Sequence, residues 1–464
     1  MGTKSLSKSL FNSIVFGKDI IMKSIVFGKD IIMKKIIMNS IVFGEIIMKK
    51  IRKKIKKWML VGVSGAIALA MGSVAFAGKL VINSNQADPK PKKAWTELVE
   101  DFKKAHPEVE VEFNTYDHES YKTSIRNWLT SEPPDVINWF AGERLNTFVS
   151  RGLIEDISDV WDANNMHDDF SSTRSSITFD GKQYAVPWGY YQWGVYYRKD
   201  LFEKYGIAVP TTWYEFVKAC ETLKSNGIIP ITIGTKYFWT AAGWFDYLNL
   251  RINGMDFHQE LMAGNASYTD QRVKDVFVKW KELLDPGYFI ENHTSYSWQE
   301  GIPPLLQGKA AMYLIGNFLM WSVPKSEDAA NLDYFQFPTI NGSLPKFEDA
   351  PTDIVAIPKG AKNKENAKKF MAFVARADVQ SKLNSAIDML PPNSKAKPKP
   401  DRFLEKGAKV LSTAAGTAQF YDRDNKPEMA TAGMKGFQEF MVKPDRLDKI
   451  LTRLEKTRKR IFKK

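Results

Sequence analysis

The chain has 464 residues, 44% of them hydrophobic, which is enough for a folded protein of about two or three domains and excludes a disordered tail. Its net charge of +13 would favour a nucleic acid or an anionic membrane as partner. Residues 1–77, however, hold 13 Lys and 1 Arg against 3 acids, a net +11, and the rest of the chain has 52 basic and 50 acidic groups. The body of the chain is nearly neutral, so we expect no nucleic-acid partner.

Cysteine and histidine usage excludes several kinds of site. The single cysteine, Cys220, cannot form an intramolecular disulfide or a Cys-x-x-Cys site, and we expect it to be a buried small hydrophobe. The five histidines are widely spread, and none has the His-Glu-x-x-His spacing of a zinc helix. The sequence therefore predicts no metal and no cofactor.

The N-terminal segment contains an internal repeat. The unit SIVFGKDIIMK occupies residues 13–23 and 24–34, and an altered copy, SIVFGEIIMKK, occupies residues 40–50. An eleven-residue period can specify a helical coil, but the β-branched run and the glycine in each copy disfavour a helix. We interpret the repeat as duplicated coding DNA, regard residues 1–47 as a dubious extension, and expect translation to begin at Met48.

A secretory signal peptide is predicted over residues 48–77. Lys49–Lys57 is densely basic, Met59–Val74 is an apolar run of 16 residues, and Ala75-Phe76-Ala77 fits the small-x-small cleavage pattern. A membrane anchor is the alternative, but a spanning helix needs about 20 apolar residues and this run is shorter. No cysteine near the cleavage site could carry a lipid. We therefore expect a mature chain that begins at Gly78 and is free in the periplasm, not a lipoprotein.

Strands and helices alternate through the start of the mature chain, as in an α/β layered domain. Leu80–Ile82 is a short apolar strand, and Trp95–Ala105 has the apolar spacing of an amphipathic helix. Val109–Phe113 alternates as a half-buried strand does. The next predicted elements are a helix over Tyr121–Leu129, a strand over Pro134–Ile137 and a helix over Leu145–Arg151.

The segment YAVPWGYYQWGVYY, residues 184–197, predicts two extended runs joined near Pro187. Thr212 and Glu215 have the spacing of a capping box, which starts a helix through about Leu223. Further elements are predicted as follows: a helix over Lys199–Tyr205 ended by Gly206, a strand over Ile228–Ile233, helices over Asp270–Leu284, Asn363–Arg376 and Asp445–Phe462, and a loop over Lys395–Asp401.

Aromatic side chains are frequent, with 13 Trp and 17 Tyr, and many stand beside polar residues in predicted loops. Aromatic faces pack on the C–H faces of pyranose rings, and carboxylates and amides hydrogen-bond to hydroxyls, so this combination favours a neutral carbohydrate as ligand. A single Trp is more often a core residue. The candidate clusters are Trp139 with Glu143 and Arg144; Trp188, Tyr190, Tyr191 and Trp193; Trp239, Trp244 and Asp246; Trp298 and Gln299; and Asn317 and Phe318.

No motif in the sequence clearly indicates a catalytic activity. The segment GIPPLLQGK, residues 301–309, departs from a phosphate loop in its glycine spacing and is followed by Ala310 in place of Ser or Thr. Glu143, Asp246 and Glu300 could serve as the acid and nucleophile of a glycosidase. Carboxylates that hold sugar hydroxyls or face solvent are the favoured interpretation, so we expect a protein that is not an enzyme.

Five ordered motifs resemble the carbohydrate-binding members of extracellular solute-binding protein family 1, the maltose-binding-protein-like substrate-binding proteins of ABC transporters. They are PPDVINWFAGERLNTFVSRGLIEDI, VPWGYYQWGVYYRKDLFEKYGIAVPTTWYEF, GIPPLLQGKAAMYLIGNF, AIPKGAKNKENAKKFMAFV and AIDMLPPNSKA. The resemblance implies the type II periplasmic binding protein fold, α/β, with a ligand cleft between two lobes joined by hinge segments. The implied parts are lobe 1 at 78–190, lobe 2 at 191–345, a return to lobe 1 at 346–392, and lobe 2 with hinge C-terminal helices at 393–464.

The resemblance also implies site residues and partners. It places Trp139, Glu143 and Arg144 on the rim of the first lobe, Tyr191 at the crossing between lobes, and Asn317 and Phe318 in a loop of the second lobe. Local context adds Trp239, Trp244, Asp246, Trp298, Asp353 and Asp422, beside Trp188 and Tyr190 of the aromatic cluster. We expect a monomer that captures a neutral mono- or oligosaccharide and delivers it to the permease subunits of an ABC transporter. A secreted glycosidase and a glycerol-phosphate binder of the same fold are the alternatives.

Overall fold

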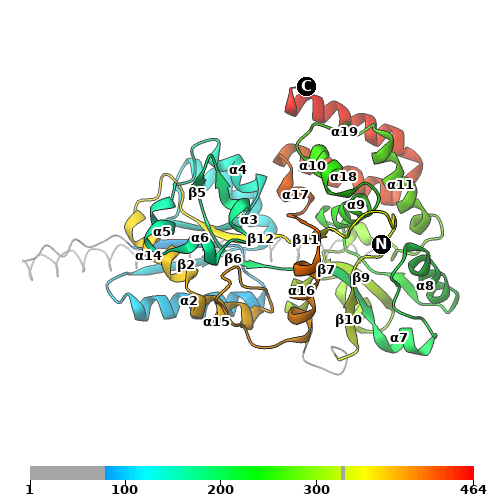
Figure 1. The fold of residues 1–464 in the computed structure, drawn as a ribbon, viewed down its shortest axis with the longest axis horizontal. Coiled ribbons are helices and arrows are strands. Elements are labelled where there is room, and N and C mark those ends of the chain that lie inside the picture. The colour runs from blue at the N-terminus through cyan, green and yellow to red at the C-terminus, as the bar shows by residue number, and fades with distance from the viewer. Residues whose placement is uncertain (1–78, 325–329, 464) are drawn as a thin grey trace, which may run out of the picture. The chain divides into compact units, whose positions relative to one another are not determined.

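A computed structural model describes residues 79–324 and 330–463, so the predicted signal peptide and the repeats lie outside the described residues. Two large β-sheets flanked by helices, with two further two-stranded sheets, make up this part of the chain (Figure 1). Within these residues, no helix combines the length and the hydropathy that crossing a membrane requires.

The first lobe is built on a five-stranded sheet in the order β2-β1-β3-β12-β6. Strand β1 pairs in parallel with β2 and β3, whereas β12 runs antiparallel to β3 and β6. The strands are β1 (Leu80–Ser84), β2 (Val111–Thr115), β3 (Val136–Phe140), β6 (Val186–Tyr190) and β12 (Thr352–Ala356). The other elements of this lobe are α2 (Pro89–Ala105), α3 (His118–Thr130), α4 (Glu143–Val149), α5 (Ser158–Ala163), α6 (Met166–Asp169), η1 (Arg174–Ile177), β4 (Thr178–Phe179), β5 (Lys182–Gln183), α14 (Lys364–Ala375) and α15 (Ala377–Ile387).

The second lobe is built on a four-stranded sheet in the order β10-β7-β9-β8, in which only β8 and β9 are parallel. The strands are β7 (Trp193–Arg198), β8 (Ile229–Ile231), β9 (Ala310–Gly316) and β10 (Leu332–Phe335). The helices are α7 (Lys199–Lys204), α8 (Trp213–Ser225), α9 (Trp239–Ile252), α10 (Gly254–Met262), α11 (Gln271–Leu284), η2 (His293–Ser295), α12 (Ile302–Leu306), η3 (Asn317–Trp321), α16 (Arg402–Thr413), α17 (Tyr421–Asp424), α18 (Pro427–Val442), η4 (Pro444–Arg446) and α19 (Leu447–Phe462).

The chain crosses between the two sheets at Tyr191 and Gln192, which separate β6 from β7. It returns from β10 to β12 through β11 (Glu348–Asp349), which pairs in parallel with β13 (Thr417–Ala418). Within the first lobe, next to these crossings, Tyr190 and Leu390 exchange two backbone hydrogen bonds, each 3.0 Å from N to O. The crossings bring segments far apart in sequence to the junction of the lobes, while the residue boundaries of the lobes drawn from the sequence stay a prediction.

Local sequence patterns predicted most of these elements. The capping box is present, because the Glu215 backbone N–H donates to Thr212 Oγ1 at 3.3 Å. Cys220 is buried, as expected. Helix α2 begins at Pro89, earlier than predicted, because proline is well suited to the first helical turn.

The break in the aromatic segment was predicted at the wrong place. The two extended runs separate at Tyr191 and Gln192, and Pro187 lies inside β6. Because β6 is the edge strand of its sheet and its pairing with β12 is irregular there, the missing N–H of a proline is tolerated.

Three carboxyl groups gather where β11 meets α9 and α17. Asp246 and Asp349 are fully buried, and both oxygens of Asp349 lack a hydrogen-bond partner among the described residues. Burial, with mutual repulsion, raises the pKa of Asp246 and Asp349 well above the usual range, and burial raises the pKa of Asp424 to about 6. The nearby cation Arg251 is engaged by Glu348 at 2.5 Å. Ionisation of this cluster therefore opposes folding.

We expect the free energy of unfolding to fall as the pH rises from about 4, the ordinary pKa of Asp, through about 6, because the folded state then holds protons that the unfolded chain has lost. Asp349→Asn should raise the melting temperature near neutral pH and change it little near pH 4, where the native carboxyl is already protonated. Differential scanning calorimetry at both pH values measures this, with the exposed Asp168→Asn as control. A gain of the same size at both pH values would contradict the assignment.

Candidate functional site

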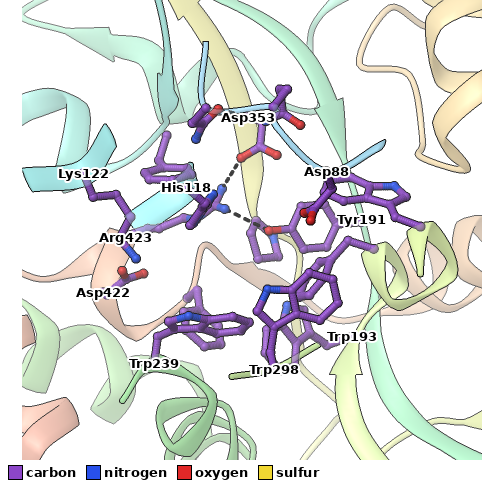
Figure 2. A pocket seen from close by; sticks show the side chains of 17 residues that line it. Asp88, His118, Lys122, Tyr191, Trp193, Trp239, Trp298, Asp353, Asp422 and Arg423 are labelled. Carbon is purple, nitrogen blue, oxygen red and sulfur yellow. Dashed lines mark hydrogen bonds and ion pairs between the residues drawn. The ribbon is translucent and has the colours of Figure 1, made fainter. Parts of the chain in front are cut away.

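A cavity of about 80 Å³ lies between the lobes and takes its lining from both (Figure 2). The first lobe contributes the ends of β1 and β3 and the start of α3, and the second lobe contributes β7, α9, η3 and α17. Since ligands of open α/β sheets bind beyond the carboxyl ends of the strands, the position itself is typical of a binding site.

One side of the cavity is aromatic and is centred on Phe318. The ring centroid of Phe318 lies 5.0 Å from Trp298, 5.3 Å from Tyr191 and 5.9 Å from Trp239. These rings meet edge to face, an arrangement that fixes their orientation. We call the rings of Tyr191, Trp239, Trp298 and Phe318 the aromatic wall. Gly316 makes room for it, because a Cβ at that position would lie 2.4 Å from the ring of Phe318. Indole and phenyl surfaces are thereby held toward the space between the lobes.

The opposite side is polar and is organised by Arg423. Its guanidinium donates to Tyr191 Oη at 2.8 Å and to the Thr352 carbonyl at 2.9 Å, and it forms an ion pair with Asp353 at 2.9 Å (Figure 2). The guanidinium also lies 4.4 Å from the ring centroid of Phe140. Burial raises the pKa of Asp353, and Arg423 opposes this shift. Burial also raises the pKa of Tyr191, so its hydroxyl keeps a proton that it can donate to a ligand.

A second pair supports this polar side from behind. Arg144 Nη1 lies 3.6 Å from Asp422 Oδ2, and its guanidinium lies 5.2 Å from the ring of Trp139. Burial lowers the pKa of Arg144, an effect that Asp422 opposes. Burial and three neighbouring cations lower the pKa of His118 well below its usual range, so its imidazole is neutral at neutral pH. The charged side chains on the polar side of the cavity are therefore largely neutralised by ion pairs with neighbouring side chains.

The structure brings some of the sequence-predicted site residues together at this cavity. Those that line it are Tyr191, Trp239, Trp298, Phe318, Asp353 and Asp422. The others lie outside the lining, and they are Trp139, Glu143, Arg144, Trp188, Tyr190, Trp244, Asp246 and Asn317. Their role in ligand binding stays a prediction, and the contacts they make point to structural tasks.

Four of these outlying residues, Trp188, Trp244, Asp246 and Asn317, are fully buried. Trp188 packs edge to face against Trp95, with 5.1 Å between ring centroids. The carboxyl group of Asp246 accepts the Tyr421 backbone N–H at 2.7 Å. Burial of this kind removes a side chain from contact with a ligand in the cavity.

Asn317 and the remaining outlying residues form hydrogen bonds with neighbouring residues of the protein. The indole of Trp139 donates to the Arg144 carbonyl at 3.2 Å, and Asn317 accepts the hydroxyl of Tyr196 at 2.7 Å. Glu143 accepts from the side chain of Asn146 at 2.7 Å. The half-buried Tyr190 is held by its backbone pairing at the end of β6. Arg144 and Asn317 thus act next to lining residues rather than in the lining.

Sequence reasoning missed most of the lining from the first lobe and the C-terminal segment. The residues that line the cavity but were absent from the predicted site are Asn85, Gln86, Asp88, His118, Lys122, Phe140, Trp321, Pro351, Phe420 and Arg423. Asn85 and Gln86 directly follow β1, and Phe140 ends β3, so the rule that places ligands beyond strand ends could have found them. Trp193 also lines the cavity; it was named in a candidate aromatic cluster but was not among the residues finally assigned to the site. No local sequence pattern pointed to Arg423.

Comparison with known proteins gives a consistent picture. Residues 86–381 match the family described as bacterial extracellular solute-binding protein. An uncharacterized ABC transporter extracellular-binding protein of Pyrococcus horikoshii is 25% identical over 334 residues, 70% of this chain and 74% of that protein. A multiple sugar-binding protein of Streptococcus mutans is 23% identical over 289 residues, 60% of this chain and 68% of that protein.

Solved structures with the same fold include the bacterial solute receptor AcbH, which is described as having an exclusive substrate preference for β-D-galactopyranose. It has a TM-score of 0.79 and 32% identity, and the match covers 83% of this chain and 99% of that one. A chitin oligosaccharide binding protein has a TM-score of 0.75 at 18% identity, over 83% of this chain and 99% of its own, and shares the fold. These two-lobed relatives confirm the fold class predicted from the sequence.

Replacing Arg423 tests the organisation of the polar side. Arg423→Met should lower the free energy of unfolding by about 3–5 kcal/mol, because it leaves the carboxylate of Asp353 buried without its ion pair. Urea denaturation measures the loss. The double variant Arg423→Met/Asp353→Asn should recover much of it, since the uncompensated charge is then gone. A single variant as stable as the native protein would contradict this role.

Proposed function

The chain belongs to the bacterial extracellular solute-binding protein family, and from this premise we propose that it captures a neutral pyranose monosaccharide in the cavity between its lobes. Delivery of that sugar to the permease subunits of an ABC transporter completes the proposal. The observation that carries it is the pairing of the aromatic wall around Phe318 with the polar side around Arg423, in one cavity that both lobes line.

The chemistry of the two sides supports a sugar ligand. A pyranose offers apolar C–H faces and a rim of hydroxyls, which match aromatic rings on one side and hydrogen-bonding groups on the other. The Tyr191 hydroxyl, the neutral imidazole of His118 and the amides of Asn85 and Gln86 supply donors and acceptors at the lining. Because most lining charges are already paired, an uncharged ligand fits most of the surface.

The size of the cavity supports a small ligand. A volume of about 80 Å³ lies far below the range of about 300–1,000 Å³ typical of pockets for drug-sized ligands. A monosaccharide is therefore favoured over an oligosaccharide. The preference described for the structural relative AcbH is for a single pyranose, which agrees with this choice.

Contacts from both lobes provide the mechanism of capture. Gln299 of the second lobe donates to Asp88 of the first at 3.4 Å, and the ion pair between Arg423 and Asp353 also joins the lobes. A ligand held between such surfaces stabilises the closed arrangement selectively, because it shifts the equilibrium only through its greater affinity for that state. Since the sugar must later be released, we expect a dissociation constant of about 1 μM, near −8 kcal/mol.

The alternatives receive less support. A glycerol-phosphate binder would need free cationic groups at the cavity, but the lining cations Arg423 and Lys122 are engaged, the latter by Glu119 at 3.0 Å. The family and the structural relatives are binding receptors and not enzymes.

We further propose that the protein works as a monomer in the periplasm, without a nucleic-acid partner.

Thermal unfolding with added sugars tests the proposal. A monosaccharide at millimolar concentration should raise the melting temperature and be recovered chemically intact, whereas a linear tetrasaccharide should raise it less. Trp239→Ala should weaken sugar binding by about 1–3 kcal/mol, taking base stacking on aromatic side chains as a loose analogue. Isothermal titration calorimetry measures the affinity.

Trp128→Ala provides the matched control, because Trp128 is half-buried like Trp239 but lies on α3 outside the cavity lining. Its sugar affinity should equal that of the native protein. If the Trp239→Ala variant binds the sugar as tightly as the native protein does, the aromatic wall is not part of the binding site. If the native protein binds no saccharide, the proposed function is refuted.

A further inference from the structure

Asp88 is the exception to the charge pairing around the cavity. It lines the cavity, and within the described ranges it forms no ion pair. The other charged side chains of the lining have ionic partners, in the pairs Arg423 with Asp353, Asp422 with Arg144, and Lys122 with Glu119. One uncompensated carboxylate therefore remains at a cavity that is otherwise balanced.

The side chain of Asp88 does not cap the helix that it precedes. Aspartate at the N-cap usually accepts a backbone N–H of the first turn, a contact worth about 1 kcal/mol. Asp88 is the N-cap of the 17-residue helix α2, yet its side chain makes no capping hydrogen bond. The carboxylate instead points into the cavity beside Tyr191 (Figure 2).

The partner of the Asp88 carboxylate within the protein is weak. The Gln299 amide donates to it at 3.4 Å, near the upper limit for a hydrogen bond. Burial raises the pKa of Asp88, which means that the site disfavours its negative charge. The positive end of α2 lies next to it and favours the ionised form. His118 cannot supply the missing charge, because its own imidazole is neutral.

A cationic group on the ligand would satisfy this carboxylate better than a hydroxyl. A hydroxyl can donate one hydrogen bond but leaves the negative charge in place, whereas an ammonium forms a charge-assisted bond about twice as strong. The same ammonium would lie near the aromatic side chains that line the cavity, such as Trp298 and Tyr191, whose faces attract cations.

We infer that the cavity prefers a monosaccharide with a protonated amine, an amino sugar, over the uncharged sugar of the same stereochemistry, and that the ammonium pairs with Asp88. This inference rests on the proposed function, a pyranose bound in this cavity, and replaces the neutral sugar proposed there with a pyranose that carries one positive charge. The aromatic wall packs against the sugar ring, and the Arg423 side hydrogen-bonds to hydroxyls. Asp88 forms an ion pair with the ammonium substituent.

Isothermal titration calorimetry with matched sugar pairs tests the inference. The probes are D-galactose with D-galactosamine and D-glucose with D-glucosamine, each titrated into the native protein near neutral pH, together with the N-acetylated amine, which keeps the nitrogen but not the charge. In the pair with the preferred stereochemistry, the amine should bind at least about tenfold more tightly than the neutral sugar. N-acetylation should abolish that advantage.

Asp88→Asn should reduce the ratio of the two affinities to about one, because the amide keeps the shape of the side chain and removes its charge. Asp117→Asn is the control. Asp117 is a neighbouring acid that caps α3 and does not line the cavity, and asparagine also caps helices, so the ratio should persist.

If the neutral sugars bind and the amines bind no more tightly, the inference is overturned and the proposed function stands. The same holds if Asp88→Asn keeps the full preference, since another group would then read the charge. If neither member of any pair binds, both the inference and the proposed function fail.

Discussion

The guanidinium of Arg423 makes the contact on which the arrangement of the cavity depends. It comes from α17, near the C-terminus, and it engages Asp353 on β12 and Tyr191 at the crossing between the sheets. These three segments are far apart in sequence and belong to different lobes. Because all of these groups are buried, their polar atoms need one another as partners, and this requirement favours the closed arrangement of the lobes.

The aromatic wall depends on the same anchor. Tyr191 is shared between the two sides, since its hydroxyl accepts from Arg423 and its ring packs against Phe318. Two residues next to the wall adopt positive φ angles, Phe238 at 68° just before α9 and Phe420 at 132° just before α17. Such conformations are costly for residues with a side chain and are concentrated at functional sites. The backbone strain at these two helix starts is therefore consistent with a surface shaped for a ligand.

Much of the fold could be predicted from local sequence, because strands and helices follow from apolar periodicity, caps and glycines. The site could be predicted only in part. In the run that contains Trp188, Tyr191 and Trp193, the sequence shows an aromatic cluster, but strand pairing decides that Trp188 faces the core while the other two reach the cavity. Arg423 and Asp88 escaped prediction because each acquires its role from a partner or a cavity that only the folded chain creates.

In the proposed mode of binding, a pyranose ring lies between the aromatic wall and the Arg423 side of the cavity. A crystal structure of the protein with a bound monosaccharide tests this most directly. We predict a pyranose whose carbon atoms lie within about 4 Å of the Trp239 or Trp298 side chain, with a polar substituent hydrogen-bonded to Asp88. A sugar bound elsewhere on the protein, with the interlobe cavity filled only by water, would contradict the account.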